Sequence, residues 1–172
     1  MTHYKLAFVG FGNVARSLVR LLARKQDFLK AHWDLTFSIT GISTGRHGCA
    51  VEPAGLNVEQ ALALIESGQS ISPLSNVRFS AANSLDVIRQ SAADVLFENS
   101  PVNHATGQPA IDHIRAALEA SMHAITANKG AVVHGYRDLT QLAKSKNRKF
   151  FFEATVLGGT PVFSVFREAL PA

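Results

Sequence analysis

The chain has 172 residues, of which 47% are hydrophobic and 17% are charged. This is enough apolar material for the packed core of one domain, so the composition excludes an intrinsically disordered chain and a coiled coil. No apolar run approaches the roughly 20 residues that a membrane-spanning helix requires, and the N-terminus shows no signal-peptide pattern. The single cysteine, Cys49, excludes an intrachain disulfide and a cysteine-based metal site, so we expect a soluble, cytoplasmic protein.

The net charge is +4, from 17 Lys and Arg against 13 Asp and Glu. This balance favours anionic ligands only weakly. Arg16, Arg20 and Arg24 share one stripe of a predicted helix, and four basic residues gather within 144–149, but solvated surfaces explain both groups. No nucleic-acid motif or interleaved aromatic residues accompany them, so we expect neither nucleic acid nor a membrane as a partner.

Strand-like and helix-like segments alternate along the chain. In chain order we predict a strand at 6–9, a helix at 14–22, a strand at 35–40, a Gly-rich loop to 55, a helix at 58–67, a short strand within 71–79, a helix at 85–91, a strand at 94–98, a helix at 109–118, a strand at 123–127, a helix at 136–145 and a strand at 149–152. Asn57 with Gln60 resembles a capping box, Ser84 is a candidate cap for the next helix, and Pro109 suits a first helical turn.

This strict alternation of strands and helices is typical of a parallel sheet covered on both faces. Right-handed crossovers then make the sheet doubly wound. We therefore predict a single α/β domain over 1–172, with a Rossmann-type, doubly wound, mainly parallel sheet and helices on both faces.

The segment Gly10-Phe11-Gly12-Asn13-Val14-Ala15 matches the dinucleotide fingerprint G-x-G-x-x-G/A, between the first predicted strand and its helix. In that motif Gly10 permits the tight turn, Gly12 lets a pyrophosphate approach the backbone, and Ala15 allows close helix–strand packing. The start of the helix offers free N–H groups and a partial positive charge to the phosphates. The alternative is a Gly-rich turn in an α/β domain that binds no nucleotide.

The end of the second predicted strand distinguishes the two nicotinamide dinucleotides. NAD-binding versions usually carry a carboxylate there for the ribose 2′-hydroxyl, whereas this chain has Ser43, Thr44 and Arg46. Two hydroxyls and a guanidinium suit a 2′-phosphate, so we expect NADP to be preferred, with NAD as the other cofactor that the site could take. Alternatively, Arg46 is simply a solvated loop residue.

Lys129 follows Asn128 just past the strand predicted at 123–127. In a doubly wound sheet this edge faces the ligand crevice, where an ammonium group could meet a ribose hydroxyl, a carboxylate or a reacting carbonyl oxygen. A helix-capping asparagine followed by a surface lysine explains the pair equally well.

The segment 152–161 is a strand end followed by a Gly-rich turn into a new helix. Glu153 and successive carbonyl groups of this turn could hold a hard cation, because such ions prefer oxygen ligands. A plain strand-to-helix turn is the alternative. The seven histidines show no H-x-x-x-H spacing, so we expect no catalytic zinc site.

Four segments together closely resemble homoserine dehydrogenase, over nearly the whole chain. They are GFGNVA at 10–15, GISTGRHG at 41–48, TGQPAIDHIRAALEASMHAITANKG at 106–130 and FFEATVLGGTPV at 151–162. The last two are typical of the nucleotide-binding half of that family in order and spacing. Asn99-Ser100-Pro101-Val102 is not the family's commonest loop, and Leu157 stands where the family commonly has glycine.

The resemblance implies NAD(P)-dependent interconversion of L-aspartate 4-semialdehyde and L-homoserine, a step towards threonine, methionine and isoleucine. It implies that 10–15 bind the pyrophosphate, that Asn99 and Ser100 line the nicotinamide side, and that Lys129 contacts the cofactor and assists at the reacting centre. It also implies a monovalent-cation site, for example for Na⁺, whose ligands would be Glu153, Val156, Gly158 and Thr160.

The family continues beyond the position of Ala172 into an α+β domain with substrate-binding carboxylates, a second catalytic lysine and a dimer interface. We therefore expect this chain to lack half of the active site and to be inactive alone, whereas the full enzyme is a homo-oligomer. Two alternatives remain: a stand-alone module that binds or senses NADP, and the nucleotide domain of another amino-acid dehydrogenase, because a fold does not fix a function.

Overall fold

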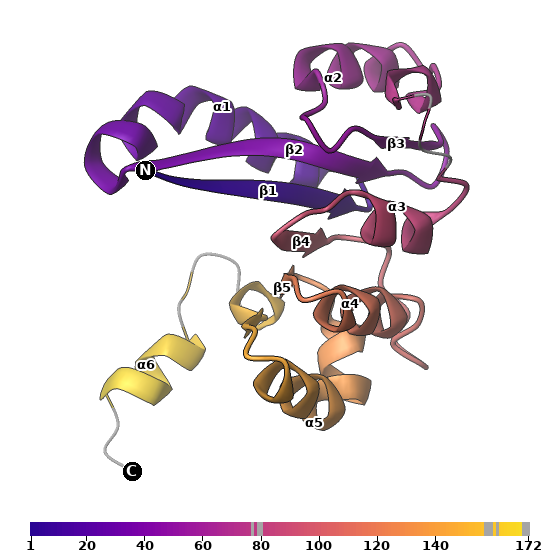
Figure 1. Cartoon of the computed structure of the whole chain (residues 1–172). Helices are drawn as coiled ribbons and strands as arrows, with labels where there is room; N and C mark the ends of the chain where they lie inside the picture. The colour runs from indigo at the N-terminus through magenta and orange to yellow at the C-terminus, as the bar shows by residue number, and fades with distance from the viewer. Residues whose placement is uncertain (77, 79–80, 157–159, 161, 170–172) are drawn as a thin grey trace.

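The computed structural model describes residues 1–76, 78, 81–156, 160 and 162–169. Within them lies a six-stranded sheet in the order β3-β2-β1-β4-β5-β6 (Figure 1). Its parallel strands are β1 (Thr2–Val9), β2 (Leu35–Ser43), β4 (Val95–Glu98), β5 (His123–Thr126) and β6 (Phe150–Phe151). The edge strand β3 (Cys49–Val51) runs antiparallel to β2. The predicted mainly parallel α/β sheet is confirmed.

Helices cover both faces of the sheet, as predicted. The covering helices are α1 (Asn13–Trp33), α2 (Val58–Glu66), α3 (Ser84–Gln90), α4 (Ala110–Glu119) and α5 (Lys129–Ser145). A last helix, α6 (Val162–Ala169), contacts the short 3₁₀ turn at Glu153–Thr155, and a second 3₁₀ turn lies at Ser72–Leu74. Alternate residues of β1 serve the two faces. Leu6 and Phe8 pack with α1 and α2, whereas Ala7 and Val9 pack with α3 and α4.

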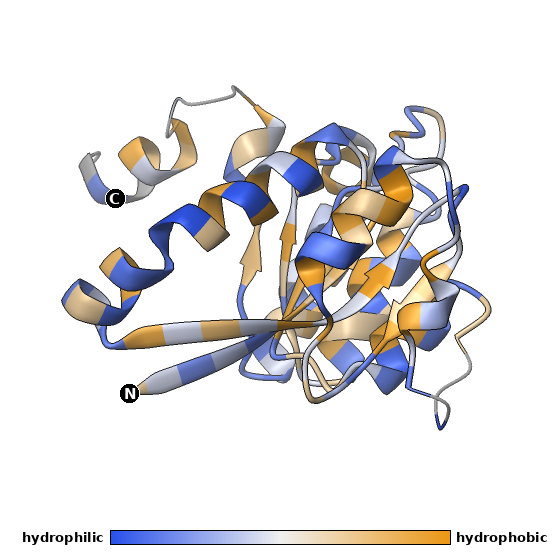
Figure 2. Cartoon of the chain, turned by 90° about the horizontal axis from the view of Figure 1, so that it is seen from above, coloured by the Kyte–Doolittle hydropathy of each residue, from blue (hydrophilic) through white to orange (hydrophobic). Residues whose placement is uncertain are grey.

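The helices α4 and α5 cover the β5 and β6 end of the sheet, where Ala124 and Phe150 join their apolar cluster. Figure 2 shows bands of hydrophilic and hydrophobic residues along α1, as expected for a helix with only one face on a sheet. In the part of the chain that the structure describes, no helix is both long and apolar enough to cross a membrane.

Several element boundaries differ from the sequence prediction. The strand β3 lies in the stretch predicted as loop, where its three residues are buried against β2 and α3. The stretch 71–76 contains a 3₁₀ turn and no strand; residues 77 and 79 lie outside the described part. The predicted strand at 149–152 narrows to Phe150–Phe151.

Hydrogen-bonded caps fix where three helices begin. Asn57 accepts from the backbone N–H of Gln60 at 3.0 Å and caps α2, as predicted. The cap of α3 is Asn83, not Ser84, because the Asn83 side chain accepts from the N–H of Asp86 at 3.0 Å. The helix α5 begins at Lys129, seven residues before the predicted start at 136.

Candidate functional site

The turn after β1 brings three strand ends together. Gly10 has φ +82°, a conformation that favours glycine, and a Cβ added to it would lie 2.3 Å from the carbonyl oxygen of Asn99. Its N–H donates to the carbonyl of Ser43 at 3.0 Å, and the N–H of Asn99 donates to that of Val9 at 2.7 Å. The ends of β1, β2 and β4 therefore meet at this glycine.

The start of α1 is open. Gly12 caps the helix in an extended conformation without any side-chain hydrogen bond, and no atom of the described residues lies within 4 Å of a Cβ added to it. The first turn carries no acidic residue. The N–H groups and the positive end of the helix dipole are thus free for an anion, and the backbone can be approached closely at Gly12.

The other residues of the predicted fingerprint divide between core and surface. Phe11 and Ala15 are buried, and Phe8 packs edge-on against Phe11. Asn13 and Val14 are exposed at the helix start, where Asn13 Oδ1 accepts from the Arg16 guanidinium at 2.7 Å. The whole segment fits the pyrophosphate-binding turn that its sequence predicts.

The three residues predicted to contact a 2′-phosphate lie in different environments. Ser43 is buried, and its Oγ lies 2.8 Å from Ser84 Oγ. Thr44 Oγ1 bonds within its own turn, donating to the carbonyl of Gly48 at 3.0 Å and accepting from the N–H of His47 at 2.6 Å. Arg46 is exposed and has no side-chain partner among the described residues. Of the three, the guanidinium of Arg46 is the group available to a ligand.

The end of β4 carries Asn99 and Ser100, which lie directly against the Gly10 turn. The Asn99 Nδ2 atom is buried and has no hydrogen-bond partner among the described residues. A buried amide donor without a partner costs free energy, so a ligand oxygen or a water at this edge would satisfy it. This observation fits a polar ligand beside Gly10.

Lys129 is exposed in the first turn of α5, at the end of β5. Asn128 caps that helix by accepting from the N–H of Gly130 at 3.1 Å. The structure therefore contains the capping asparagine and surface lysine of the simpler interpretation, and it also places Lys129 at the carboxyl edge of the sheet, just after the end of β5. The two interpretations describe the same geometry.

Glu98, the last residue of β4, was not among the predicted site residues. It is fully buried directly beneath the Asn99–Ser100 segment. The signal in the sequence is a lone carboxylate that ends the otherwise apolar strand VLFE. A buried carboxylate requires several donors around it, which identifies such a residue as part of a hydrogen-bonded network.

Three of the four predicted cation ligands lie in the part of the chain that the structure describes. The Glu153 carboxylate accepts from the backbone N–H groups of Phe163 at 2.7 Å and Ser164 at 3.3 Å, and from the Ser164 hydroxyl at 3.2 Å, so it caps α6. Val156 and Thr160 are exposed, and Gly158 lies outside the described residues. In this conformation the Glu153 carboxylate caps the helix, so a cation could bind it only in place of these hydrogen bonds.

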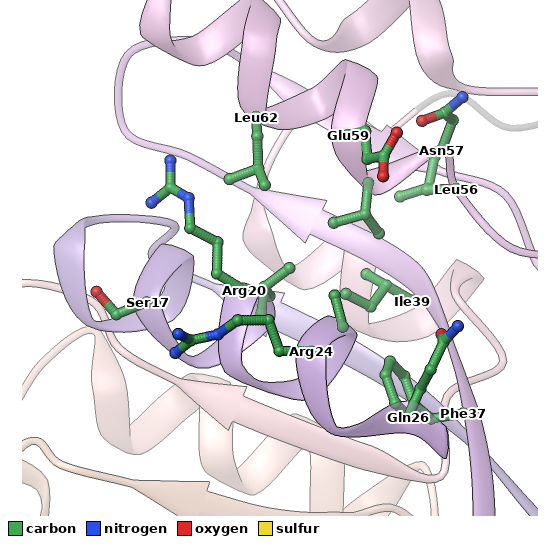
Figure 3. Close-up of a pocket in the computed structure, with 13 residues that line it drawn as sticks. Ser17, Arg20, Arg24, Gln26, Phe37, Ile39, Leu56, Asn57, Glu59 and Leu62 are labelled. Carbon is green, nitrogen blue, oxygen red and sulfur yellow. The ribbon is translucent and has the colours of Figure 1, made fainter. Parts of the chain in front are cut away.

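A hollow of about 750 Å³ lies elsewhere, between α1, β2 and α2 (Figure 3). Phe37, Ile39 and Leu56 form part of its apolar lining, and Arg20 and Arg24 of the basic stripe border it. None of the lining residues belongs to the sheet edge at Gly10. The candidate dinucleotide site is therefore defined by the strand ends and not by this hollow.

The carboxyl ends of β1 and β4 lie side by side, although α1, β2, β3, α2 and α3 separate them in sequence. The chain leaves β1 towards β2 on one side and returns to β4 on the other, which is the switch point where open α/β sheets bind ligands. Gly10, Gly12, Asn99, Ser100 and Lys129 all follow strand ends at this edge.

Comparisons with known proteins agree with this geometry. The family described as "Homoserine dehydrogenase, NAD binding domain" matches residues 10–153. An NAD(+)-dependent homoserine dehydrogenase of Pseudomonas canavaninivorans is 34% identical over 99% of this chain and 48% of the relative. A homoserine dehydrogenase of Methanocaldococcus jannaschii is 32% identical over 96% of this chain and 48% of its own length. The chain thus spans about half the length of these curated relatives.

Solved structures give the same assignment. A hyperthermophilic archaeal homoserine dehydrogenase mutant in complex with NADPH has a TM-score of 0.79 and 25% identity, over 98% of this chain and 49% of that chain. A putative homoserine dehydrogenase of Archaeoglobus fulgidus has a TM-score of 0.77 and 26% identity, over 97% and 47%. The resemblance predicted from the four sequence segments is confirmed: this chain belongs to the homoserine dehydrogenase family and has the fold of its NAD(P)-binding domain.

Proposed function

We propose that the chain is the NADP-binding part of an enzyme that interconverts L-aspartate 4-semialdehyde and L-homoserine. The dinucleotide, when bound, supplies or accepts the hydride at its nicotinamide ring. The protein orients it: the turn 10–15 and the start of α1 bind the pyrophosphate, and Asn99 and Ser100 border the nicotinamide half. A role in amino-acid biosynthesis, a cytoplasmic location and assembly into a homo-oligomer belong to the same proposal.

The observation that carries this proposal is the close approach of the Gly10 turn to the Asn99–Ser100 segment, next to an open helix start. A dinucleotide has a pyrophosphate at its centre and the nicotinamide at one end, so it needs these two features side by side. The unpartnered Nδ2 of Asn99 supplies a donor at the same place.

Lys129 is proposed to stabilise the negative charge that develops on the substrate oxygen. Its exposed ammonium group stands at the end of β5, on the same sheet edge as Gly10. Removing one such electrostatic contact typically slows turnover by about 10²–10³-fold. Because the relatives are about twice as long, the groups that bind the substrate are proposed to lie outside these 172 residues.

The proposal is tested by calorimetric titration of the chain with NADPH and NADH, followed by an assay with L-aspartate 4-semialdehyde. We expect saturable binding of NADPH and no turnover by the chain alone. Absence of binding to either dinucleotide would refute the proposed function. Turnover by the chain would refute our claim that half of the active site lies elsewhere, and would leave the binding function intact.

Preference for NADP over NAD rests on Arg46. Its guanidinium is exposed at the end of β2 without a partner in the described residues, and no carboxylate occupies the neighbouring positions 42–48. Since a hydrogen bond to a charged group contributes about 1.5–3 kcal/mol, Arg46→Ala is expected to narrow the difference in affinity between NADPH and NADH by about tenfold or more. Arg24→Ala, an exposed arginine far along α1, serves as the control and should leave that difference unchanged.

A monovalent cation bound by Glu153, Val156, Gly158 and Thr160 stays a prediction of the family resemblance. Occupation of this site would require Glu153 to give up its bonds to α6. A titration with NaCl at constant ionic strength that shifts the backbone amide signals of Phe163 and Ser164 would support it.

A further inference from the structure

Glu98 accepts hydrogen bonds from two neighbouring segments while being completely excluded from solvent. Its Oε1 accepts from the backbone N–H of Ser100 at 3.0 Å and from the Ser100 hydroxyl. Its Oε2 lies 3.0 Å from the hydroxyl of Thr126 on β5, and His113 Nδ1 of α4 lies 3.5 Å from Oε1. Burial of a carboxylate is costly unless donors surround it, and here both oxygens are engaged.

The bonds continue from Glu98 into a closed network. The Thr126 hydroxyl also accepts from the backbone N–H of Asn128 at 3.0 Å. The side-chain amide of Asn128 donates to the carbonyl of Ser100 at 3.2 Å, which returns to the segment that Glu98 holds. Glu98, Ser100, Asn128 and Thr126 thus tie the ends of β4 and β5 to the start of α5, where Lys129 lies.

The same segment supports the dinucleotide turn. A Cβ added to Gly10 would lie 2.5 Å from the backbone nitrogen of Ser100, so the turn rests directly on this peptide. The backbone N–H of Ser100 donates to the Glu98 carboxylate and not to the Gly10 turn. The Asn99–Ser100 peptide is therefore held on one side by its hydrogen bonds to the Glu98 carboxylate and packed on the other side against Gly10.

We propose that Glu98 is a positioning residue for the nicotinamide half of the dinucleotide. It acts by holding the Asn99–Ser100 peptide and, through Thr126 and Asn128, the start of α5 in one arrangement. Its carboxylate is fully buried, so it acts through these neighbours. The proposal rests on the proposed function, in which Asn99, Ser100 and Lys129 border the nicotinamide.

The network distinguishes conservative from disruptive substitutions of Glu98. In Glu98→Gln the amide oxygen can accept from the Ser100 N–H and hydroxyl. The new amide NH₂ can donate to Thr126 Oγ1, because the Thr126 hydroxyl hydrogen can turn to the Glu98 carbonyl oxygen, 3.1 Å away. In Glu98→Leu the side-chain volume is similar, but the N–H and the hydroxyl of Ser100 lose their acceptor, and the Thr126 hydroxyl keeps only the backbone carbonyl of residue 98.

The test compares two probes on the 172-residue chain: NADPH, and 2′,5′-ADP, which carries only the adenosine half of the same cofactor. For Glu98→Leu we expect a loss of about tenfold or more in NADPH affinity, since unpaired buried donors are costly. Affinity for 2′,5′-ADP should stay within about twofold. Glu98→Gln should restore NADPH binding to within about threefold of the unaltered chain.

Two further variants keep the test decisive. Thr126→Val removes one arm of the network without changing the side-chain shape, and should selectively weaken NADPH binding even if Glu98→Leu does not fold. Leu139→Ala, a fully buried position in α5 outside the network, controls for general destabilisation and should weaken neither probe selectively.

Equal weakening of both probes in Glu98→Leu and Thr126→Val would reduce the network to a structural role and overturn the proposal. Unchanged NADPH affinity in both variants would overturn it as well. If the unaltered chain binds 2′,5′-ADP and NADPH equally tightly, the nicotinamide half contributes nothing to the affinity. In that case Glu98 has no bound group to position, and only this inference fails. If the chain binds neither probe, the proposed function fails with it.

Discussion

Gly10 lies so close to Asn99 that a single added carbon would overlap the Asn99 carbonyl oxygen at 2.3 Å. The two residues are distant in sequence but follow adjacent parallel strands, β1 and β4. Their contact joins the phosphate-binding turn to the segment that borders the nicotinamide in our proposal. The consequences for stability and binding can be separated by substituting the two glycines of the turn.

Gly10→Ala is expected to destabilise the fold by about 2 kcal/mol or more. The φ of +82° alone costs a non-glycine residue about 1–2 kcal/mol, and the new methyl group must also displace backbone atoms of Asn99 and Ser100. Urea unfolding followed by circular dichroism measures this change. Stability equal to that of the unaltered chain would show that the turn can move away from Asn99.

Gly12→Ala should have little effect on stability but should weaken the binding of NADPH. Gly12 has φ −81°, and no atom in the described part of the chain lies within 4 Å of the added methyl group, so the free energy of unfolding should change by less than about 1 kcal/mol. Binding of NADPH should nevertheless weaken, because the methyl group occupies the space that a pyrophosphate needs above the helix start. Unfolding and calorimetry on the same sample test both halves, and unchanged NADPH affinity would contradict the assigned position of the pyrophosphate.

The pH dependence of stability should contain a contribution from His123. Its burial, followed by the nearby charge of Arg148, lowers the pKa of His123 below its usual value of 6.5, although Asp94 opposes the shift. Its Nδ1 accepts from the Lys149 N–H at 2.9 Å, which requires an unprotonated nitrogen.

A histidine with a lowered pKa in the folded state takes up its proton more readily after unfolding. The stability that His123 contributes is therefore complete above pH 6.5 and is lost as the pH falls from 6.5 towards the lowered pKa. His123→Asn should remove this part of the dependence in urea unfolding between pH 7.5 and 5. An identical dependence of the free energy of unfolding on pH in the two proteins would contradict the lowered pKa of His123.

Glu153→Ala tests whether this carboxylate is a helix cap. It accepts from the N–H groups of Phe163 and Ser164, so its loss should cost α6 about 1 kcal/mol and speed exchange of these amide hydrogens about fivefold. Glu168→Ala, an exposed acidic residue on the same helix, is the matched control. Unchanged exchange at Phe163 in Glu153→Ala would show that α6 does not depend on the carboxylate.

Local patterns in the sequence predict most of this fold. The run ending at Gly10, the Asn57–Gln60 cap and the apolar centre of β4 each depend on neighbours within a few positions, so their elements are found in place. The start of α5 is different, because Gly130 and Gly135 disfavour a helix by local propensity. Both are buried in tight packing: a Cβ on Gly130 would lie 2.4 Å from the Asn103 carbonyl oxygen, and one on Gly135 would lie 3.1 Å from Ile111.

The fingerprint at 10–15 was predictable because its function requires particular residue types at fixed spacing. The hydrogen-bonded surroundings of Glu98 are not predictable in this way, because Thr126 reaches its carboxylate only when β4 and β5 pair. The buried hydroxyl of Ser43 likewise has its hydrogen-bond partner in Ser84, which is 41 residues away in the chain. Contacts of this kind are properties of the tertiary structure and leave no periodic pattern in the sequence.

We propose that a nicotinamide dinucleotide binds at the carboxyl edge of the sheet, across Gly10 and Asn99. The most direct measurement is the change in backbone amide NMR signals of the chain on addition of NADPH. We expect the largest changes at 10–15, around Arg46 and at 99–100, with smaller ones at Lys129. Changes confined to the hollow between α1 and α2, at Arg20, Arg24 and Leu62, would contradict it.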